Sequence, residues 1–159
     1  MNDILVEGII LPDKPLSNFE LLDAVKKLKI KNFRGIFMRD ELPQKPNKKE
    51  CGILNLDDAG NSVNGYFVDN PPGNNGTHWV CWFCRGKDPS YYFDSFGLSP
   101  PLEIKKYLFS QGKGEIEFNI SQIQPLGTNI CGHLCLYILN KLDKGEDFKI
   151  VLEALSLRN

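Results

Sequence analysis

The sequence predicts an α+β fold, in which a mixed, mostly antiparallel central sheet packs against a helix that begins at Cys131. Two apolar runs, 77–84 and 91–95, flank a short turn, as the strands of a hairpin do. The segment 115–120 alternates apolar and polar residues, which is typical of a strand with one buried face. Helical patterns come before and after these strands instead of alternating with each of them, which favours the α+β class.

The N-terminal part is expected to begin with one helix. Ser17 or Asn18 caps it, and its apolar residues recur at helical spacing over 19–28. The segment 33–38 is either a short strand or an extended linker. The segment 40–50 contains two prolines and several lysines, so we expect an exposed loop there.

The remaining elements follow from apolar segments bounded by turn-forming residues. Strands are expected at 51–56, 66–68, 77–84, 91–95 and 115–120. Helices are expected at 100–109, where two prolines open the first turn, at 131–141 and at 147–155. The segment 69–76 consists almost entirely of turn formers and is expected to be a surface loop.

Length and charge limit the classes of protein to which the chain can belong. With 159 residues, a single domain over 1–159 and a monomer are expected. The net charge of −1 gives no general attraction to nucleic acid. No apolar stretch is long enough to span a membrane, and no N-terminal signal pattern is visible, so a protein that is not secreted is expected.

The cysteines and glycines do not form the usual cofactor motifs. Five cysteines cannot all pair within one chain, so free thiols in a reducing compartment are expected. Cys81 and Cys84 form a Cys-x-x-Cys pair, but no second pair completes a zinc site, and on a strand the two face opposite sides. No glycines have phosphate-loop spacing. Neither a metal nor another cofactor is therefore expected.

Cys131 is placed where a nucleophilic cysteine would lie. It begins a helix, whose N-terminal N–H groups favour a thiolate, and Gln124 precedes it by seven residues, as a side-chain donor to an oxyanion would. Of the two histidines, His133 points about 200° away from Cys131 on the same helix, which leaves His78 as the better base. If strands 77–84 and 91–95 pair with residue numbers that sum to about 175, Asp94 lies near His78.

Each of these residues also has an ordinary structural explanation. A cysteine on an apolar helix is usually a buried core thiol. An aspartate before a turn is usually a cap or part of an Asx-turn. The order His, Asp, Gln, Cys-Gly at these short spacings nevertheless favours a catalytic set.

These motifs resemble those of the adenovirus maturation protease, adenain, and of the related proteases that cleave the ubiquitin-like protein SUMO. The matching segments are 76–79, 93–97 and Gln124 with Cys131-Gly132. The resemblance implies a papain-like cysteine protease fold. It makes Cys131 the nucleophile, His78 the general base and acid, and Asp94 the residue that orients His78. Gln124 would then donate to the oxyanion with the Cys131 N–H. Trp79 either walls the substrate cleft or packs in the core.

The resemblance further implies a cysteine endopeptidase that cleaves viral polypeptide precursors during capsid maturation, after a small residue such as glycine. The chain is shorter than adenain and has no excess of basic residues, and no cysteine lies between Asp94 and Cys131, so activation by DNA or by a disulfide-linked peptide is not carried over from the resemblance. An origin in a virophage or Polinton-like virus is expected, with the protein in the virion, host cytoplasm or viral factory. Two alternatives stay open: a deubiquitinase-like or deSUMOylase-like enzyme, and a non-catalytic protein-binding module.

Overall fold

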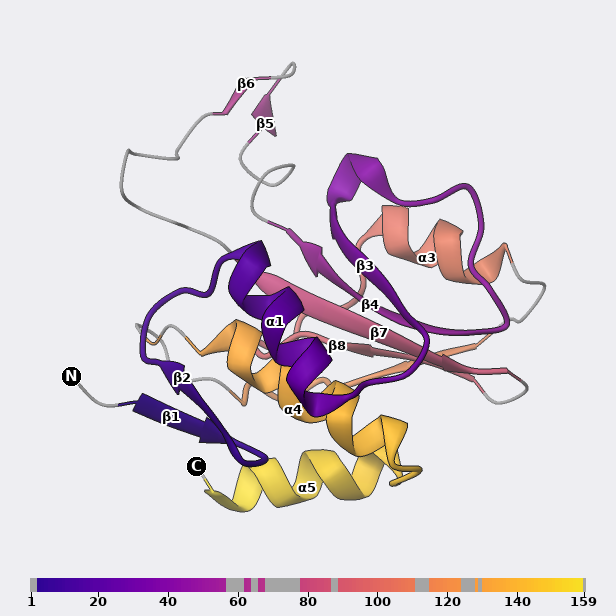
Figure 1. The fold of residues 1–159 in the computed structure, drawn as a ribbon. Coiled ribbons are helices and arrows are strands. Elements are labelled where there is room, and N and C mark those ends of the chain that lie inside the picture. Colours follow the sequence, from indigo (N-terminus) through magenta and orange to yellow (C-terminus); the bar gives the residue numbers. More distant parts are fainter. Residues whose placement is uncertain are drawn as a thin grey trace.

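The computed structural model describes residues 3–56, 62–63, 66–67, 78–86, 89–110, 115–123, 128 and 130–158. In order along the chain, the elements are β1 (Asp3–Val6), β2 (Ile9–Pro12), α1 (Asn18–Leu28), β3 (Phe33–Met38), the 3-10 helix η1 (Arg39–Glu41), β4 (Lys49–Asn55), β5 (Ser62–Val63), β6 (Tyr66–Phe67), β7 (Trp79–Arg85), β8 (Ser90–Phe93), α3 (Leu102–Phe109), β9 (Ile116–Phe118), α4 (Cys131–Asp143) and α5 (Phe148–Arg158). The predicted mixed α+β architecture is confirmed (Figure 1).

The central sheet has the strand order β3-β4-β7-β8-β9. Its middle strands, β4, β7 and β8, pair antiparallel, whereas both edge strands pair parallel with their neighbours. The expectation of a mostly antiparallel sheet therefore holds only in the middle. Each parallel pairing requires a long connection, and α3 lies in the connection between β8 and β9.

Strand β7 is buried on both faces because helices cover the sheet from both sides. Its residues alternate between two apolar clusters: Trp79, Cys81 and Phe83 in one, and Val80, Trp82 and Cys84 in the other. The prediction that Cys81 and Cys84 face opposite sides is thus confirmed. A strand that is apolar at every position is the pattern expected of a central strand with two covered faces.

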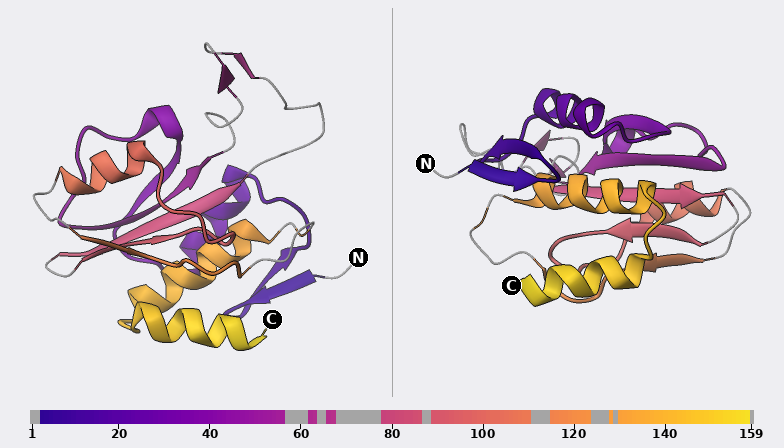
Figure 2. Two further views of the ribbon diagram at one scale, coloured as in Figure 1. Left: turned by 180° about the vertical axis from the view of Figure 1, so that it is seen from behind. Right: turned by 60° about the horizontal axis from the view of Figure 1, so that its bottom comes forward.

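Helices α1, α4 and α5 pack on one face of the sheet, and α3 packs on the other (Figures 1 and 2). The N-terminus of α1 carries a capping box, in which the Ser17 hydroxyl accepts from the Glu20 N–H and Glu20 accepts from the Ser17 N–H. Of the two caps considered from the sequence, Ser17 is therefore the one observed. Helix α4 lies against β7 with a largely buried surface, so its position depends on the sheet.

The N-terminal hairpin was not predicted from the sequence. Strands β1 and β2 pair with Val6 opposite Ile9, and both turn residues, Glu7 and Gly8, have positive φ angles, as a tight two-residue hairpin requires. The hairpin packs on α4, where the carbonyl of its last residue, Pro12, forms a hydrogen bond with His133 Nε2. A third, two-stranded sheet pairs β5 with β6, which covers part of the strand predicted at 66–68. The loop predicted at 69–76 lies outside the described residues.

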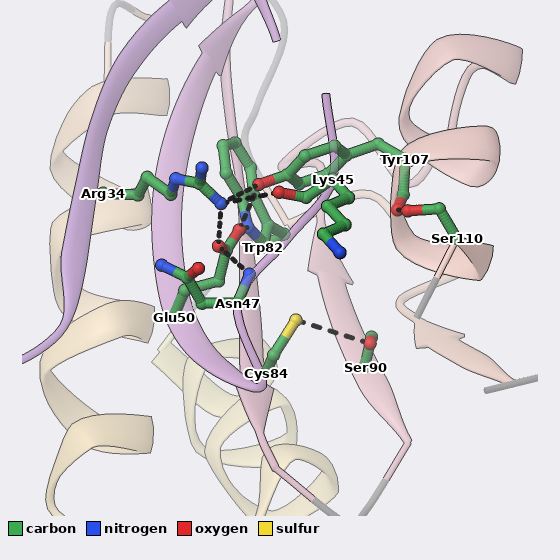
Figure 3. A network of polar contacts seen from close by, with 9 residues as sticks. All are labelled: Arg34, Lys45, Asn47, Glu50, Trp82, Cys84, Ser90, Tyr107 and Ser110. Carbon is green, nitrogen blue, oxygen red and sulfur yellow. Dashed lines mark hydrogen bonds and ion pairs between the residues drawn. The ribbon is translucent and has the colours of Figure 1, made fainter. Parts of the chain in front are cut away.

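The prediction of an exposed loop over 40–50 is wrong at its end, since β4 begins at Lys49 and Glu50 is buried. The Glu50 carboxylate accepts four hydrogen bonds (Figure 3), which explains how a charge is buried there. One oxygen accepts from the Arg34 guanidinium at 2.8 Å and the Asn47 N–H at 2.7 Å. The other accepts from the Trp82 indole at 2.8 Å and the Tyr107 hydroxyl at 2.6 Å.

No helix in the described part of the chain is both long enough and apolar enough to cross a membrane.

The network around Glu50 predicts a large stability effect. Glu50→Ala would leave Arg34, Trp82 and Tyr107 without their shared acceptor, and we expect the free energy of unfolding to fall by about 3–5 kcal/mol. Urea denaturation measures this change. The control Asp23→Ala breaks an exposed pair with Lys27 at 2.9 Å and should cost less than about 1 kcal/mol. Equal effects of the two substitutions would contradict a structural role for the network.

Candidate active site

The candidate site lies at one end of the central sheet, because several strand ends meet there. Strand β7 begins at Trp79 and β8 ends at Phe93, and these ends coincide in an antiparallel pair. Strand β9 runs parallel to β8 and ends at Phe118, so the residue after it lies at the same end. Residues that directly precede β7 or follow β8 and β9 are therefore neighbours in space.

His78 and Asp94 form a hydrogen bond at this end of the sheet. His78 Nε2 lies 2.8 Å from Asp94 Oδ1, and the two side chains are 14% and 0% exposed. Residues of β7 and β8 pair with numbers that sum to 174, as for Cys81 and Phe93, close to the predicted register. Both side chains lie just beyond the paired segment, and this allows them to meet although they are not directly opposite.

The turn after β8 holds Asp94 in place. Asp94 Oδ1 also accepts the Phe96 N–H at 2.8 Å, so the residue belongs to an Asx-turn as well as to the pair with His78. The Phe96 ring stacks on the His78 imidazole with centroids 4.8 Å apart. Gly97 closes the turn with a φ of +76°, and a Cβ there would come within 2.8 Å of the Ser121 backbone. The turn thus fixes the imidazole as well as the carboxylate.

Asn119 was missed by the sequence analysis. Its side chain accepts from the Asp94 N–H at 3.1 Å and donates to the Asp94 carbonyl at 2.6 Å, and it is buried. It therefore clamps the backbone of the residue that bonds His78. No motif marks Asn119 in the sequence. The available signal is its position directly after β9, at the same end of the sheet as Asp94.

Cys131 is the first residue of α4, and its Sγ accepts the Trp79 N–H at 3.4 Å. Strand β8 pairs with β7 from Cys81 onward, so Trp79 lies beyond that pairing. Its carbonyl accepts from Cys135 Sγ at 3.4 Å, one helical turn further along α4. Two sulfur atoms of α4 thus contact the backbone of Trp79, and Trp79 follows His78 directly in the chain.

The electrostatics of His78 fit this arrangement. Burial lowers the pKa of His78, but hydrogen bonds to Asp94 and to Cys131, together with their charges, raise it to about 9. His78 therefore lies between a carboxylate and a sulfur atom and is protonated at neutral pH. Since Nε2 bonds Asp94, Nδ1 is the nitrogen left to face Cys131. The geometry can hold an imidazolium beside a thiolate.

The structure brings together three of the predicted site residues, His78, Asp94 and Cys131. Gln124, the predicted oxyanion donor, lies outside the described residues. For Trp79 the structure shows packing, because its indole is buried and donates to the Leu16 carbonyl at 2.9 Å. Trp79 is also one of the residues that line a groove of about 560 Å³, and its role as a wall of the substrate cleft stays a prediction.

His133 and Cys135 pack in the interior, as expected. His133 bonds the Pro12 carbonyl at 2.8 Å, and burial lowers the pKa of its imidazole. Burial also raises the pKa of the Cys135 thiol. Among the described residues, no group of His, Cys, Asp and Glu side chains is arranged to hold a metal ion.

Asp94→Asn tests the coupling between the carboxylate and the imidazole. Removing the negative charge while keeping an oxygen for Phe96 should lower the pKa of His78 well below about 9, because burial then acts with less opposition. NMR titration of the ring measures this shift. The His133 imidazole bonds the Pro12 carbonyl and not Asp94, so its pKa should stay unchanged and its resonance serves as the internal control. An unchanged His78 titration would contradict the coupling.

The same shift predicts how stability depends on pH. The folded-state pKa of His78 lies above its ordinary value of 6.5, so protonated His78 stabilises the fold below about pH 6.5, and this contribution is lost as pH rises through about 9. We expect the His78 contribution to the free energy of unfolding to fall over that window in the wild type and to change far less in Asp94→Asn. Chemical denaturation at pH 6 and pH 9.5 separates the two results.

Comparison with known proteins identifies the fold but no family. No protein-family model matches the chain, and no curated protein matches it. Two crystal structures of the ASFV pS273R protease, one of them with selenomethionine, match 91% of this chain, with TM-scores of 0.53 and 0.51 and sequence identities of 15% and 14%. The match covers 66% of the length of those chains. The chain therefore has the fold of a viral protease that is longer than itself.

Proposed function

We propose that the chain is a viral cysteine endopeptidase. The observation that carries this proposal is the placement of His78, which bonds buried Asp94 on one side and Cys131, at the start of α4, on the other. This is the arrangement of nucleophile, base and orienting group that acyl transfer by a thiol requires. The fold shared with the ASFV pS273R protease gives independent support.

In the proposed reaction, Cys131 Sγ attacks the scissile carbonyl carbon, and the carbonyl oxygen becomes an oxyanion. Collapse of this intermediate expels the amine, which takes a proton from His78, and leaves a thioester on Cys131. Water then adds to the thioester and gives a proton to His78, and the carboxyl product leaves. The Cys131 N–H, at the first residue of α4, and the Gln124 side chain are the proposed donors to the oxyanion.

We propose that the substrate is a virion or capsid precursor cleaved after a small residue such as glycine. This part of the proposal follows from the resemblance of the site motifs to those of adenain and from the position of Trp79, whose N–H contacts Cys131 Sγ. The proposed enzyme acts as a monomer without a cofactor, in the virion or in the host cytoplasm or viral factory. A virophage or Polinton-like source is part of the same proposal.

Two observable results distinguish the alternatives from this proposal. A deubiquitinase-like or deSUMOylase-like enzyme would process members of a panel of ubiquitin-like proteins and leave a co-expressed capsid precursor intact. A non-catalytic binding module would process neither. The buried contact between His78 and Asp94 beside Cys131 disfavours such a module, because a binding surface has no need of an oriented imidazole at a thiol.

Thiol labelling tests the nucleophile directly. All five cysteines are buried, and Cys131 is the most exposed of them at 5%. We expect iodoacetamide or a peptide aldehyde to modify Cys131 ahead of the other four, as mapped by mass spectrometry, and His78→Ala to slow the modification at least about tenfold. Uniform labelling of all five thiols would contradict an activated Cys131.

Cleavage of a co-expressed capsid precursor tests the reaction. Cys131→Ala should lower the rate by about 10⁴-fold or more, because the covalent step is lost. The matched control Cys84→Ala removes a thiol on the opposite face of the sheet and should keep activity. Unchanged processing in Cys131→Ala would overturn the proposed function.

A further inference from the structure

A groove of about 560 Å³ opens at the same end of the sheet as His78 and Cys131. Trp79 connects the groove with Cys131, since it is one of the residues that line the groove and its N–H contacts Cys131 Sγ. Strand pairing explains why the groove lies there: Asn55 is opposite Met38 in β3 and opposite Trp79 in β7, and all three line the groove. A chain bound at Cys131 therefore has this groove beside it.

The charged side chains of the groove leave one negative charge uncompensated. Lys14 and Glu20 form an ion pair at 3.3 Å, so their charges offset each other. Glu41, at the end of η1, accepts the Met38 N–H at 3.0 Å with one carboxylate oxygen. Within the described residues no cation pairs with it, and the neighbouring Arg39 is bound to Glu103 at 2.6 Å.

The rest of the lining combines polar and apolar residues. The half-buried Ile36, Phe37 and Met38 offer apolar surface on which a methylene chain can pack, while the acidic group belongs to an exposed residue, Glu41. A long side chain with an apolar stem and a cationic end matches both features at once. A carboxylate side chain would be repelled by Glu41.

We propose that this groove binds a lysine or arginine side chain of the polypeptide substrate, close to the scissile bond, and that Glu41 recognises its positive charge. The inference rests on the proposed protease function and adds to it a determinant of substrate choice. Glu41 acts on substrate binding and takes no part in bond cleavage.

Cleavage of a peptide library by the wild-type chain, with products identified by mass spectrometry, tests the inference. We expect one position near the cleavage site to favour lysine or arginine over glutamine by about two- to fivefold in kcat/KM, as for a partly exposed ion pair. Glu41→Gln keeps the oxygen that accepts the Met38 N–H, so the fold is retained while the preference disappears. Glu41→Lys should make glutamate the favoured residue at that position.

Asp40→Asn is the matched control, because it removes a charge from the same 3-10 turn but outside this groove, and the preference should persist. A wild-type chain that cleaves the library with no basic preference, or a preference that survives in Glu41→Gln, would overturn the inference and leave the protease function standing. A chain that cleaves no peptide and shows no selective labelling of Cys131 would overturn both.

Discussion

The contact of Trp79 with α4 is the constraint on which the site depends. Strand β8 does not pair with β7 at Trp79, and the Trp79 N–H and carbonyl contact the sulfur atoms of Cys131 and Cys135 instead. Because a buried backbone needs partners, this arrangement fixes the first turn of α4 against the end of β7. His78 is one residue earlier in the chain. The proposed base and the proposed nucleophile are therefore connected by one peptide unit and by the contact between the Trp79 N–H and Cys131 Sγ.

The mixed pairing of the sheet decides which residues reach that end. Both edge strands run parallel to their neighbours, so β3 and β9 finish at the end where β7 begins. Met38 thereby lines the groove, and Asn119 reaches the Asp94 backbone. An antiparallel edge would place the last residue of β3 or β9 at the opposite end of the sheet, and the site would lose its groove wall or its clamp.

The sequence predicted elements that depend on a local pattern, but it did not predict the roles of residues whose hydrogen-bond partners are distant in the sequence. The helix at Cys131 and the strand predicted at 77–84, which the structure has at 79–85, follow from local apolar runs. In the hairpin, the predicted sum of paired residue numbers, about 175, is one more than the observed sum. Glu50 looks like a loop residue because nothing nearby in the sequence shows that Trp82 and Tyr107 bind it. Asn119 becomes meaningful only when β9 is known to pair with β8 in parallel.

The two buried carboxylates at opposite ends of the sheet, Glu50 and Asp94, differ in how many of their oxygens are hydrogen-bonded. The difference agrees with a structural role for Glu50 and the proposed catalytic role for Asp94. Glu50 lies opposite Cys84, which is roughly 20 Å from His78 along β7 if each strand residue advances by about 3.3 Å. Four hydrogen-bond donors hold the Glu50 carboxylate in a single arrangement. Asp94 bonds His78 and the turn through the same oxygen, and its other oxygen has no hydrogen-bond partner among the described residues. In the proposed reaction each proton transfer changes the charge of the imidazole beside Asp94, so this carboxylate cannot be matched to one charge state alone.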